Sequence, residues 1–152
     1  MKPTMRIVLV GMGLVLIGCT RASEVKTSSH AERPGAINLA RWLDAHPLPL
    51  DETFSIVELG KTDSSSMHLV QLRHQEVLHV HRSHDLVLVL ERGYGTLQLG
   101  AQTLTMKPGD VVAIPRNAPH AFTNLSHQPA AELVVYSPPY DETDTISVHT
   151  KP

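Results

Sequence analysis

The chain has 152 residues, and its 13 Lys and Arg against 15 Asp and Glu give a net charge of −2 when the ten histidines are neutral. Aromatic residues make up 4% of the sequence, and no basic stripe interleaved with aromatic residues is present, which argues against a nucleic-acid binder. The length allows one domain with a substantial core, and we expect its partner to be a small molecule or an ion.

The first residues have the form of an export signal. A basic start, MKPTMR, precedes the uncharged run IVLVGMGLVLI at residues 7–17, which is short for a bilayer core of about 30 Å. The segment LIGC, ending at Cys19, resembles the lipobox of bacterial lipoproteins. The resemblance implies a lipoprotein signal peptide over residues 1–18 and acylation of Cys19, with an ordinary secretory signal as the alternative. Thr20 resembles the outer-membrane sorting pattern, so in a Gram-negative cell we expect an exported protein, lipid-anchored on the periplasmic face of the outer membrane.

Cys19 is the only cysteine, so no intramolecular disulfide can form, although export predicts an oxidising compartment. Residues 19–36 are polar and without apolar periodicity, which is typical of a flexible tether. The segment INLARWLDAHPLP then places apolar residues on one side around Trp42, and Pro47 stops the pattern. We predict one short helix there.

From about Thr53 the pattern changes to short β-type runs separated by turn residues. The runs are FSIVEL, MHLVQLR, LVLVLE, TLQL, VVAIP, HAFTN and AELVVYS. Seven or more short strands at close spacing predict an all-β sandwich or barrel. The acidic tail, residues 140–152, is expected either to wrap around the outside or to stay mobile.

Three histidines and an aspartate lie within seven positions, in the segment HVHRSHD. Because side chains alternate along a strand, His79 and His81 are expected to share one face. Asp85 rejoins that face if the connecting residues stay extended or make a compensated turn, and His84 then points away. Two imidazoles and one carboxylate on one face can hold a first-row divalent metal. An inert His-x-His pair on an exposed strand is the alternative.

A second informative stretch is GDVVAIPRNAPHAFTN. Together with HVHRSHD, it resembles the two sequence motifs of the cupin superfamily. The second motif is matched at its spacing by Gly109, Pro115, His120 and Asn124. Asn117 replaces the middle glycine, a mild change because Asn tolerates a left-handed turn conformation. The first motif is matched by His79, His81 and Asp85. It departs from the family pattern in having Asp for Glu, Arg73 for the opening glycine, and the closing glycine displaced by one, to Gly93.

The resemblance covers roughly residues 53–139. It implies a single cupin barrel, that is, a double-stranded β-helix or jelly roll, which with the short helix forms a domain over residues 37–139. By motif position it also implies one divalent metal ion, Fe, Mn, Ni or Zn. The implied ligands are His79, His81, Asp85 and His120. Asp is one methylene shorter than Glu and reaches less far toward a metal, so His84 is an alternative to Asp85 as the fourth ligand. A barrel that holds no metal is a further alternative.

Strand parity assigns places to other residues. Asn124 shares the face of His120, where it would orient a ligand or make a strand-end hydrogen bond. Phe122, on the same face, is expected to line the barrel interior. Arg73 shares the parity of His79, so it would meet an anionic substrate or else face solvent. His68 is expected to be exposed.

The strand LVLVLE is apolar on both faces, which implies that its outer face is covered as well. The helix near Trp42 or a second subunit could provide the cover, and a homodimer is therefore expected as one possibility.

Three functions are compatible with these patterns. The first is a metal-dependent enzyme acting on a small organic molecule, since cupins of this size resemble dioxygenases, decarboxylases and isomerases. The second is a non-catalytic receptor for a metal or small molecule at the cell envelope, and the third is a metal-free scaffold. Catalysis usually needs a proton-transfer group beside the metal. The sequence offers no second carboxylate in a clearly suitable position, so the catalytic residues stay unassigned.

Overall fold

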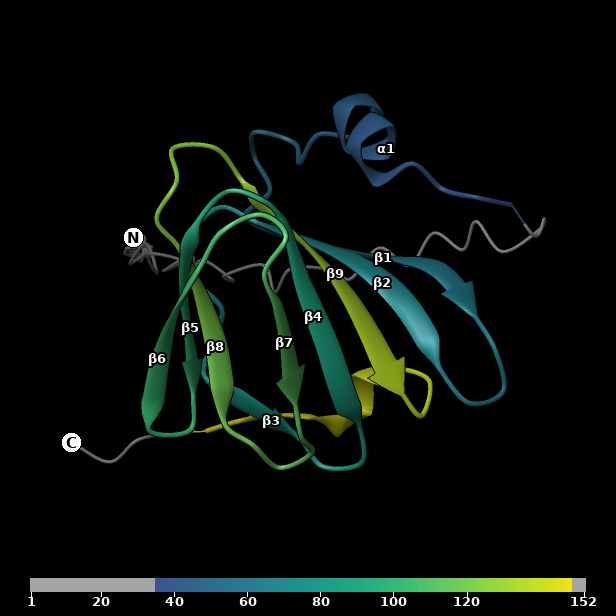
Figure 1. Cartoon of the computed structure of the whole chain (residues 1–152), viewed down its shortest axis with the longest axis vertical. Helices are drawn as coiled ribbons and strands as arrows, with labels where there is room; N and C mark the ends of the chain where they lie inside the picture. The colour runs from purple at the N-terminus through teal and green to yellow at the C-terminus, as the bar shows by residue number, and fades with distance from the viewer. Residues whose placement is uncertain (1–34, 149–152) are drawn as a thin grey trace, which may run out of the picture.

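The computed structural model describes residues 35–148 of the chain. Within that range, ten strands form two sheets of five, which are the two layers of a barrel (Figure 1). The first sheet has the order β1 (Phe54–Lys61), β2 (Ser66–Leu72), β9 (Ala130–Ser137), β4 (Asp85–Arg92), β7 (Val111–Ile114). The second has the order β10 (Thr145–Ser147), β3 (His79–His81), β8 (His120–Asn124), β5 (Gly95–Leu99), β6 (Gln102–Met106). The prediction of an all-β jelly roll with one short helix is confirmed.

The predicted signal peptide, Cys19 and nearly all of the predicted tether lie outside the described residues. The short helix α1 (Leu39–Ala45) is where the sequence predicted it. Asn38 caps its first turn, because the side-chain oxygen accepts a hydrogen bond from Arg41 N at 3.0 Å. No helix within residues 35–148 has the length and apolar character that a membrane crossing requires.

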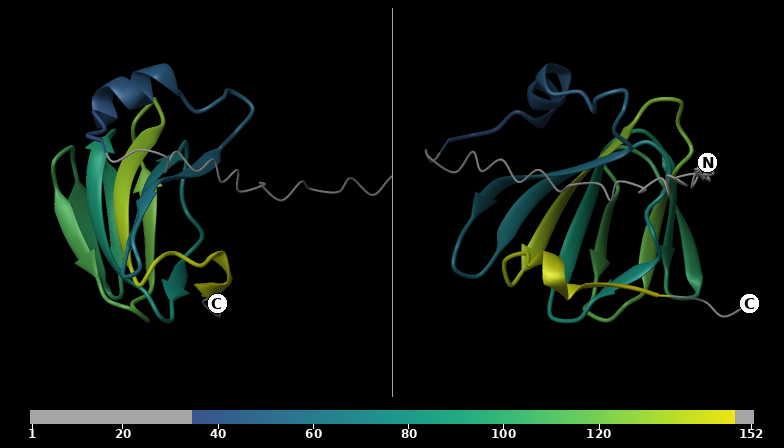
Figure 2. Two further views of the ribbon diagram at one scale, coloured as in Figure 1. Left: turned by 90° about the vertical axis from the view of Figure 1, so that its right-hand side faces the viewer. Right: turned by 180° about the vertical axis from the view of Figure 1, so that it is seen from behind.

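Helix α1 packs on the outer face of the first sheet, over β1, β2 and β9 (Figure 2). The buried residues of this outer cluster are Leu43, Leu59, Leu69 and Ala131. The helix contacts β4 at its last residue, where Arg92 bonds to Asp44, but it leaves Val87 on the outer face 42% exposed. The strand predicted to need a cover on its outer face is β4. Helix α1 covers the neighbouring strands β1, β2 and β9 instead, and it leaves most of the outer face of β4 open.

The main core fills the space between the two sheets. It contains Ile56, Val70, Leu72, Leu86, Leu88, Leu90, Leu97, Met106, Ile114, Phe122, Ala130, Val134 and Tyr136. The backbone is most crowded at Gly95, where an added Cβ would lie 2.1 Å from Thr123 O. Glycine is required there because no side chain fits beside the neighbouring strand.

The connection between β3 and β4 decides which side chains face the core. These two strands belong to different sheets, so residues 82–84 carry the chain across the barrel instead of continuing one strand. As a result Leu86 and its alternate neighbours on β4 face the interior, whereas Asp85 and Val87 face outward. The expectation that Asp85 rejoins the face of His79 is wrong, because an alternation of side chains holds only within one strand.

Asn117 lies in the turn that connects β7 with β8. Its φ of 64° is left-handed, as expected for the residue that replaces a glycine of the cupin motif. Its backbone N donates a hydrogen bond to His81 O at 2.7 Å. The turn therefore holds the start of β8, with His120, beside the end of β3.

The C-terminal segment closes one end of the barrel. The chain leaves β9 through Ser137, forms the single turn η1 (Glu142–Asp144) and then adds β10 to the edge of β3 (Figure 2). Thr145 pairs with His81 in that ladder. Of the two alternatives for the tail, the structure supports wrapping for residues 140–148.

Candidate functional site

Three histidines from two strands meet inside the barrel. His79 of β3 lies directly opposite His120 of β8, and their ring centroids are 4.3 Å apart. The ring of His81 is 5.1 Å from that of His79 and 5.4 Å from that of His120. One nitrogen from each residue lies within 4.8 Å of one nitrogen from each of the others. We call these three residues the histidine triad.

Backbone carbonyls orient two of the three rings. Nδ1 of His79 lies 2.7 Å from Val77 O, and Nδ1 of His120 lies 2.9 Å from Ala118 O. Because a carbonyl oxygen only accepts hydrogen bonds, each Nδ1 carries a hydrogen, and in the neutral ring the lone pair therefore lies on Nε2. Nε2 of His81 is buried and has no hydrogen-bond partner among residues 35–148. Such unpaired imidazole nitrogens are suitable ligands for a first-row divalent metal.

Burial keeps the imidazoles of His81 and His120 uncharged. Burial, followed by the charges of His79 and His120, lowers the pKa of His81 to about 3. Burial and then His79 lower the pKa of His120 to about 4. Both rings are therefore neutral at pH 7, which is the form that binds a metal.

A second group shares His81 with the triad. His81, His84 and Asp144 also place one possible ligand atom each within 4.8 Å of one another. His84 is buried, with Nδ1 2.5 Å from Asp144 Oδ2 and Nε2 2.9 Å from Pro139 O. Since both ring nitrogens already have acceptors, His84 serves first to hold the C-terminal segment on the barrel.

The structure does not bring Asp85 to the triad. Its carboxylate faces outward and accepts hydrogen bonds from Arg116, including one from the backbone N at 2.9 Å. Hydrogen bonds from the Arg116 side chain and then from its backbone lower the pKa of Asp85 to about 2. The expected ligand set of three histidines and Asp85 is thus reduced to the three histidines. His84 lies nearby, with its ring centroid 6.0 Å from that of His81.

Comparison with known proteins gives the family. Residues 67–136 match the model of the cupin domain. The chain belongs to the cupin superfamily. A relative from Aquifex aeolicus, an uncharacterized protein, is 34% identical over 97 residues, which cover 64% of this chain and 79% of the relative.

Solved structures show the same fold as this cupin. TT1209 from Thermus thermophilus is 25% identical with a TM-score of 0.59, covering 69% of this chain and 98% of TT1209. An uncharacterized conserved protein with a double-stranded β-helix domain from Klebsiella pneumoniae is 15% identical with a TM-score of 0.59, covering 71% of this chain and 95% of that protein. The second likeness extends to the fold alone.

Three residues assigned to the surroundings of the cupin site make structural contacts. Asn124 donates hydrogen bonds to backbone oxygens, among them Gln128 O at 2.8 Å, and accepts one from Ser126 N. Of its two expected roles, the structure supports the strand-end hydrogen bond. Phe122 is fully buried in the main core, as expected. The guanidinium of Arg73 donates to the backbone oxygens of residues 48, 49 and 52, so it ties the loop after α1 to β2.

Two carboxyl groups that the fold withdraws from solvent were missed by the sequence analysis. Glu76 lies in the loop before β3, and its Oε2 accepts a hydrogen bond from Phe122 N at 2.9 Å. Glu132 is 1% exposed in β9, and its Oε1 has no partner within the described part of the chain. Burial, followed by the charge of Glu76, raises the pKa of Glu132 well above its usual value. Burial also raises the pKa of Glu76, and the charge of His79 has a smaller opposite effect on it. The sequence did contain an indication for Glu132: in the run AELVVYS it occupies one of the alternate positions that face the core.

The expectation that His68 is exposed is wrong. It is 3% exposed on β2. Its ring lies 5.3 Å from that of Tyr136 and 5.1 Å from that of Tyr140. The ring of Tyr136 is in turn 5.5 Å from that of His81. His68 therefore belongs to the same polar and aromatic end of the barrel interior as the triad.

Proposed function

We propose that this cupin binds one divalent first-row metal ion through Nε2 of His79, His81 and His120. The observation that carries the proposal is the convergence of three imidazoles, two with Nδ1 tied to a carbonyl and one with a buried, unpartnered Nε2. Three imidazoles suit Fe, Mn, Ni and Zn. When bound, the ion would act as a Lewis acid toward an oxygen-bearing substrate.

We further propose that the protein is an enzyme acting on a small organic molecule, with reactions of the dioxygenase, decarboxylase or isomerase type as the candidates. A receptor or a scaffold needs no proton-transfer group, whereas catalysis usually does. Glu76 and Glu132 support the enzyme, because burial raises the pKa of both carboxyl groups and groups with perturbed pKa values are common at catalytic sites. The full burial of Glu132 also lowers the stability of the fold, and a scaffold has no functional need for a buried carboxyl group.

Elemental analysis tests the metal proposal. The protein, purified without a polyhistidine tag, is compared with His120→Ala and with His127→Ala, which removes an exposed histidine. We expect about one equivalent of metal in the wild type and in His127→Ala, and loss of the metal in His120→Ala, which lacks one of the three ligands. A wild-type protein that takes up no metal, even after reconstitution, would leave a metal-free binding protein or scaffold.

We propose that the protein is anchored by a lipid at Cys19 to a bacterial membrane, on the periplasmic face of the outer membrane in a Gram-negative cell. The lipobox resemblance supports this location, since several acyl chains hold a protein stably on a bilayer. Cell fractionation of a Cys19→Ser variant tests it. Release of the variant into the soluble fraction supports the anchor, and continued membrane association contradicts it.

A homodimer through the outer face of the first sheet is a separate proposal. Its support is the exposure of apolar side chains that α1 leaves uncovered, with Met67 and Val87 42% exposed and Val111 61% exposed. Sedimentation at several protein concentrations tests the dimer, together with a Val87→Glu variant. A wild-type protein that sediments as a monomer would rule the dimer out.

A further inference from the structure

A β-bulge turns a lysine toward the barrel interior. Glu58 of β1 lies opposite His68 of β2, but the next pairs are Gly60 with Met67 and Lys61 with Ser66, so Leu59 is the extra residue of a bulge. In a regular strand, residues 58 and 61 would face opposite sides. The bulge places Lys61 on the same side as Glu58, and bulges commonly re-aim side chains beside binding sites.

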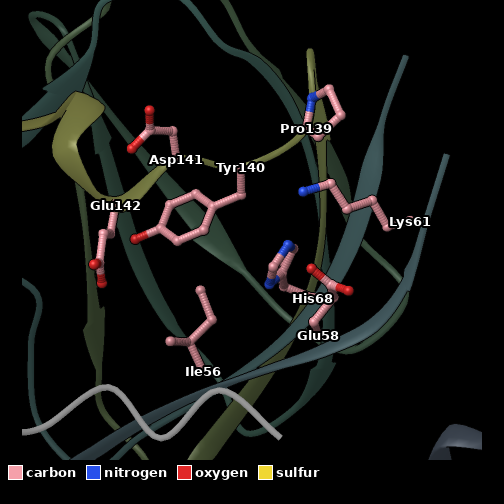
Figure 3. Close-up of a pocket in the computed structure, with 8 residues that line it drawn as sticks. All are labelled: Ile56, Glu58, Lys61, His68, Pro139, Tyr140, Asp141 and Glu142. Carbon is pink, nitrogen blue, oxygen red and sulfur yellow. The ribbon is translucent and has the colours of Figure 1, made fainter. Parts of the chain in front are cut away.

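These residues line a cavity of about 490 Å³. Glu58, Lys61 and His68 come from the strands, and the C-terminal segment faces them with Tyr140, Asp141 and Glu142 (Figure 3). The ammonium of Lys61 makes no ion pair with any residue between 35 and 148. A volume of several hundred cubic ångströms is typical of small-molecule sites.

One wall of this cavity carries an imidazole nitrogen without a hydrogen-bond partner among the described residues. His68 Nε2 lies 2.9 Å from Ser66 Oγ, which also accepts a hydrogen bond from Tyr140 N at 2.8 Å. Ser66 Oγ can donate to Nε2 or accept from it, according to the tautomer of the His68 ring. Among the described residues Nδ1 has no hydrogen-bond partner, so it can serve a ligand as donor or as acceptor. Burial and then Lys61 lower the pKa of His68 to about 4, which keeps the ring neutral at pH 7.

The cavity adjoins the histidine triad across two tyrosines. The rings of Tyr136 and Tyr140 lie 4.7 Å apart, and both contact His68. On their other side, the ring of His81 is 5.5 Å from Tyr136 and 6.4 Å from Tyr140. One layer of aromatic side chains thus separates the cavity from the triad.

We propose that this cavity binds a small, uncharged, polyhydroxylated molecule of the size of a monosaccharide. A hydroxyl group both donates and accepts, so it can donate to the Glu58 carboxylate, accept from Lys61 and pair with either tautomer of His68. The ring of Tyr140 offers an apolar surface for the carbon face of a sugar. Binding rests on the cavity alone, whereas the idea that the bound molecule is the substrate rests on the metal proposal above.

The charges of the cavity disfavour ionic ligands. The residues that line the cavity carry three carboxylates, those of Glu58, Asp141 and Glu142, and one ammonium, that of Lys61. A carboxylate or phosphate ligand would meet a net negative wall. A cationic ligand would leave the Lys61 ammonium without an acceptor and would meet its like charge.

Ligand-observed NMR with the full-length protein in detergent tests the proposal. The neutral probes are methyl α-D-glucopyranoside, methyl β-D-galactopyranoside and myo-inositol, and the charged probes of similar shape are D-glucuronate and D-glucosamine. We expect saturable binding of at least one neutral probe, with a Kd on the order of 1 mM, and weaker binding of both charged probes. No saturable binding of any neutral probe, or tighter binding of a charged one, overturns the proposal.

Matched variants locate the binding. Lys61→Met and Glu58→Gln change residues that line the cavity and are expected to weaken binding at least fivefold. Lys107→Met removes an exposed lysine outside the cavity and should leave binding unchanged. Equal affinity in all three variants would contradict the assignment of the site. The measurements are made with and without added Zn²⁺, so that the metal site and the sugar-binding cavity are tested separately. If the protein binds a sugar but takes up no metal, only the metal site is refuted.

Discussion

Nδ1 of His84 lies 2.5 Å from Oδ2 of Asp144, and this contact fastens the C-terminal segment to the barrel. The same carboxylate accepts hydrogen bonds from the backbone N and the hydroxyl of Ser83. The segment in turn places Tyr140 against His68 and pairs Thr145 with His81. One carboxylate therefore supports both the wall of the cavity and the edge of the strand that carries two triad histidines.

Asp144→Asn should loosen this segment. The variant weakens hydrogen bonds to a charged group, each of which contributes roughly 1.5–3 kcal/mol. We expect amide hydrogen exchange in β10 to become about tenfold faster or more. Exchange measured by mass spectrometry checks this. Asp141→Asn is the control, because within residues 35–148 the Asp141 carboxylate bonds only to Thr143 of its own turn. Unchanged protection of β10 in Asp144→Asn would show that the β3 pairing alone holds the segment.

Asp85→Asn should leave metal binding intact. Asp85 fits the cupin motif in sequence, yet its carboxylate faces outward and pairs with Arg116. Elemental analysis of Asp85→Asn beside His120→Ala is expected to show full metal content in the first and loss in the second. A loss of metal in Asp85→Asn equal to that in His120→Ala would restore Asp85 as a ligand and would mean that β4 rearranges when metal binds.

The sequence was sufficient for the elements whose signal is local. Apolar runs between turn residues predicted seven of the strands, and Pro47 predicted the end of α1. For these strands and the helix the pattern extends over several residues within one element, so alternation or spacing is informative. That His79, His81 and His120 gather in one place is a long-range feature, and it was implied only by the resemblance of the two motifs to the cupin superfamily.

Features that depend on contacts between elements could not be predicted in this way. Asp85 was misplaced because the chain changes sheets at residues 82–84, and alternation does not continue through such a crossing. Lys61 reaches the cavity only through the bulge at Leu59, which is defined by pairing with β2. His68 looked like a surface residue because the aromatic rings that cover it come from β9 and the C-terminal segment, far away in the chain.

Glu132→Gln should stabilise the protein in a pH-dependent manner. Burial raises the pKa of Glu132 well above 4.5, so between 4.5 and the raised value the folded state binds more protons than the unfolded state. Stability therefore falls as the pH rises through that range. The glutamine variant lacks this titration, and we expect it to be more stable than the wild type by roughly 1 kcal/mol or more at pH 8. The difference should be smaller at pH 4.

Urea unfolding at pH 4, 6 and 8 measures this difference. Glu91→Gln, on the neighbouring strand β4, is the control for the loss of one charge at a less buried position. Wild-type and Glu132→Gln curves that stay a constant distance apart at all three pH values would contradict a raised pKa of Glu132.

His68→Gln should weaken the acid sensitivity of the fold. The pKa of His68 is lowered to about 4 in the folded protein, so between about 6.5 and 4 the unfolded state binds more protons. The wild type should therefore lose stability as the pH falls from 6.5 to 4, whereas a variant without this imidazole should lose less. Urea unfolding of the metal-free protein at pH 7, 5.5 and 4.5 gives the slopes. His127→Gln, which changes an exposed ring, should keep the wild-type slope. Identical slopes in all three proteins would mean that the triad histidines alone set the response to acid.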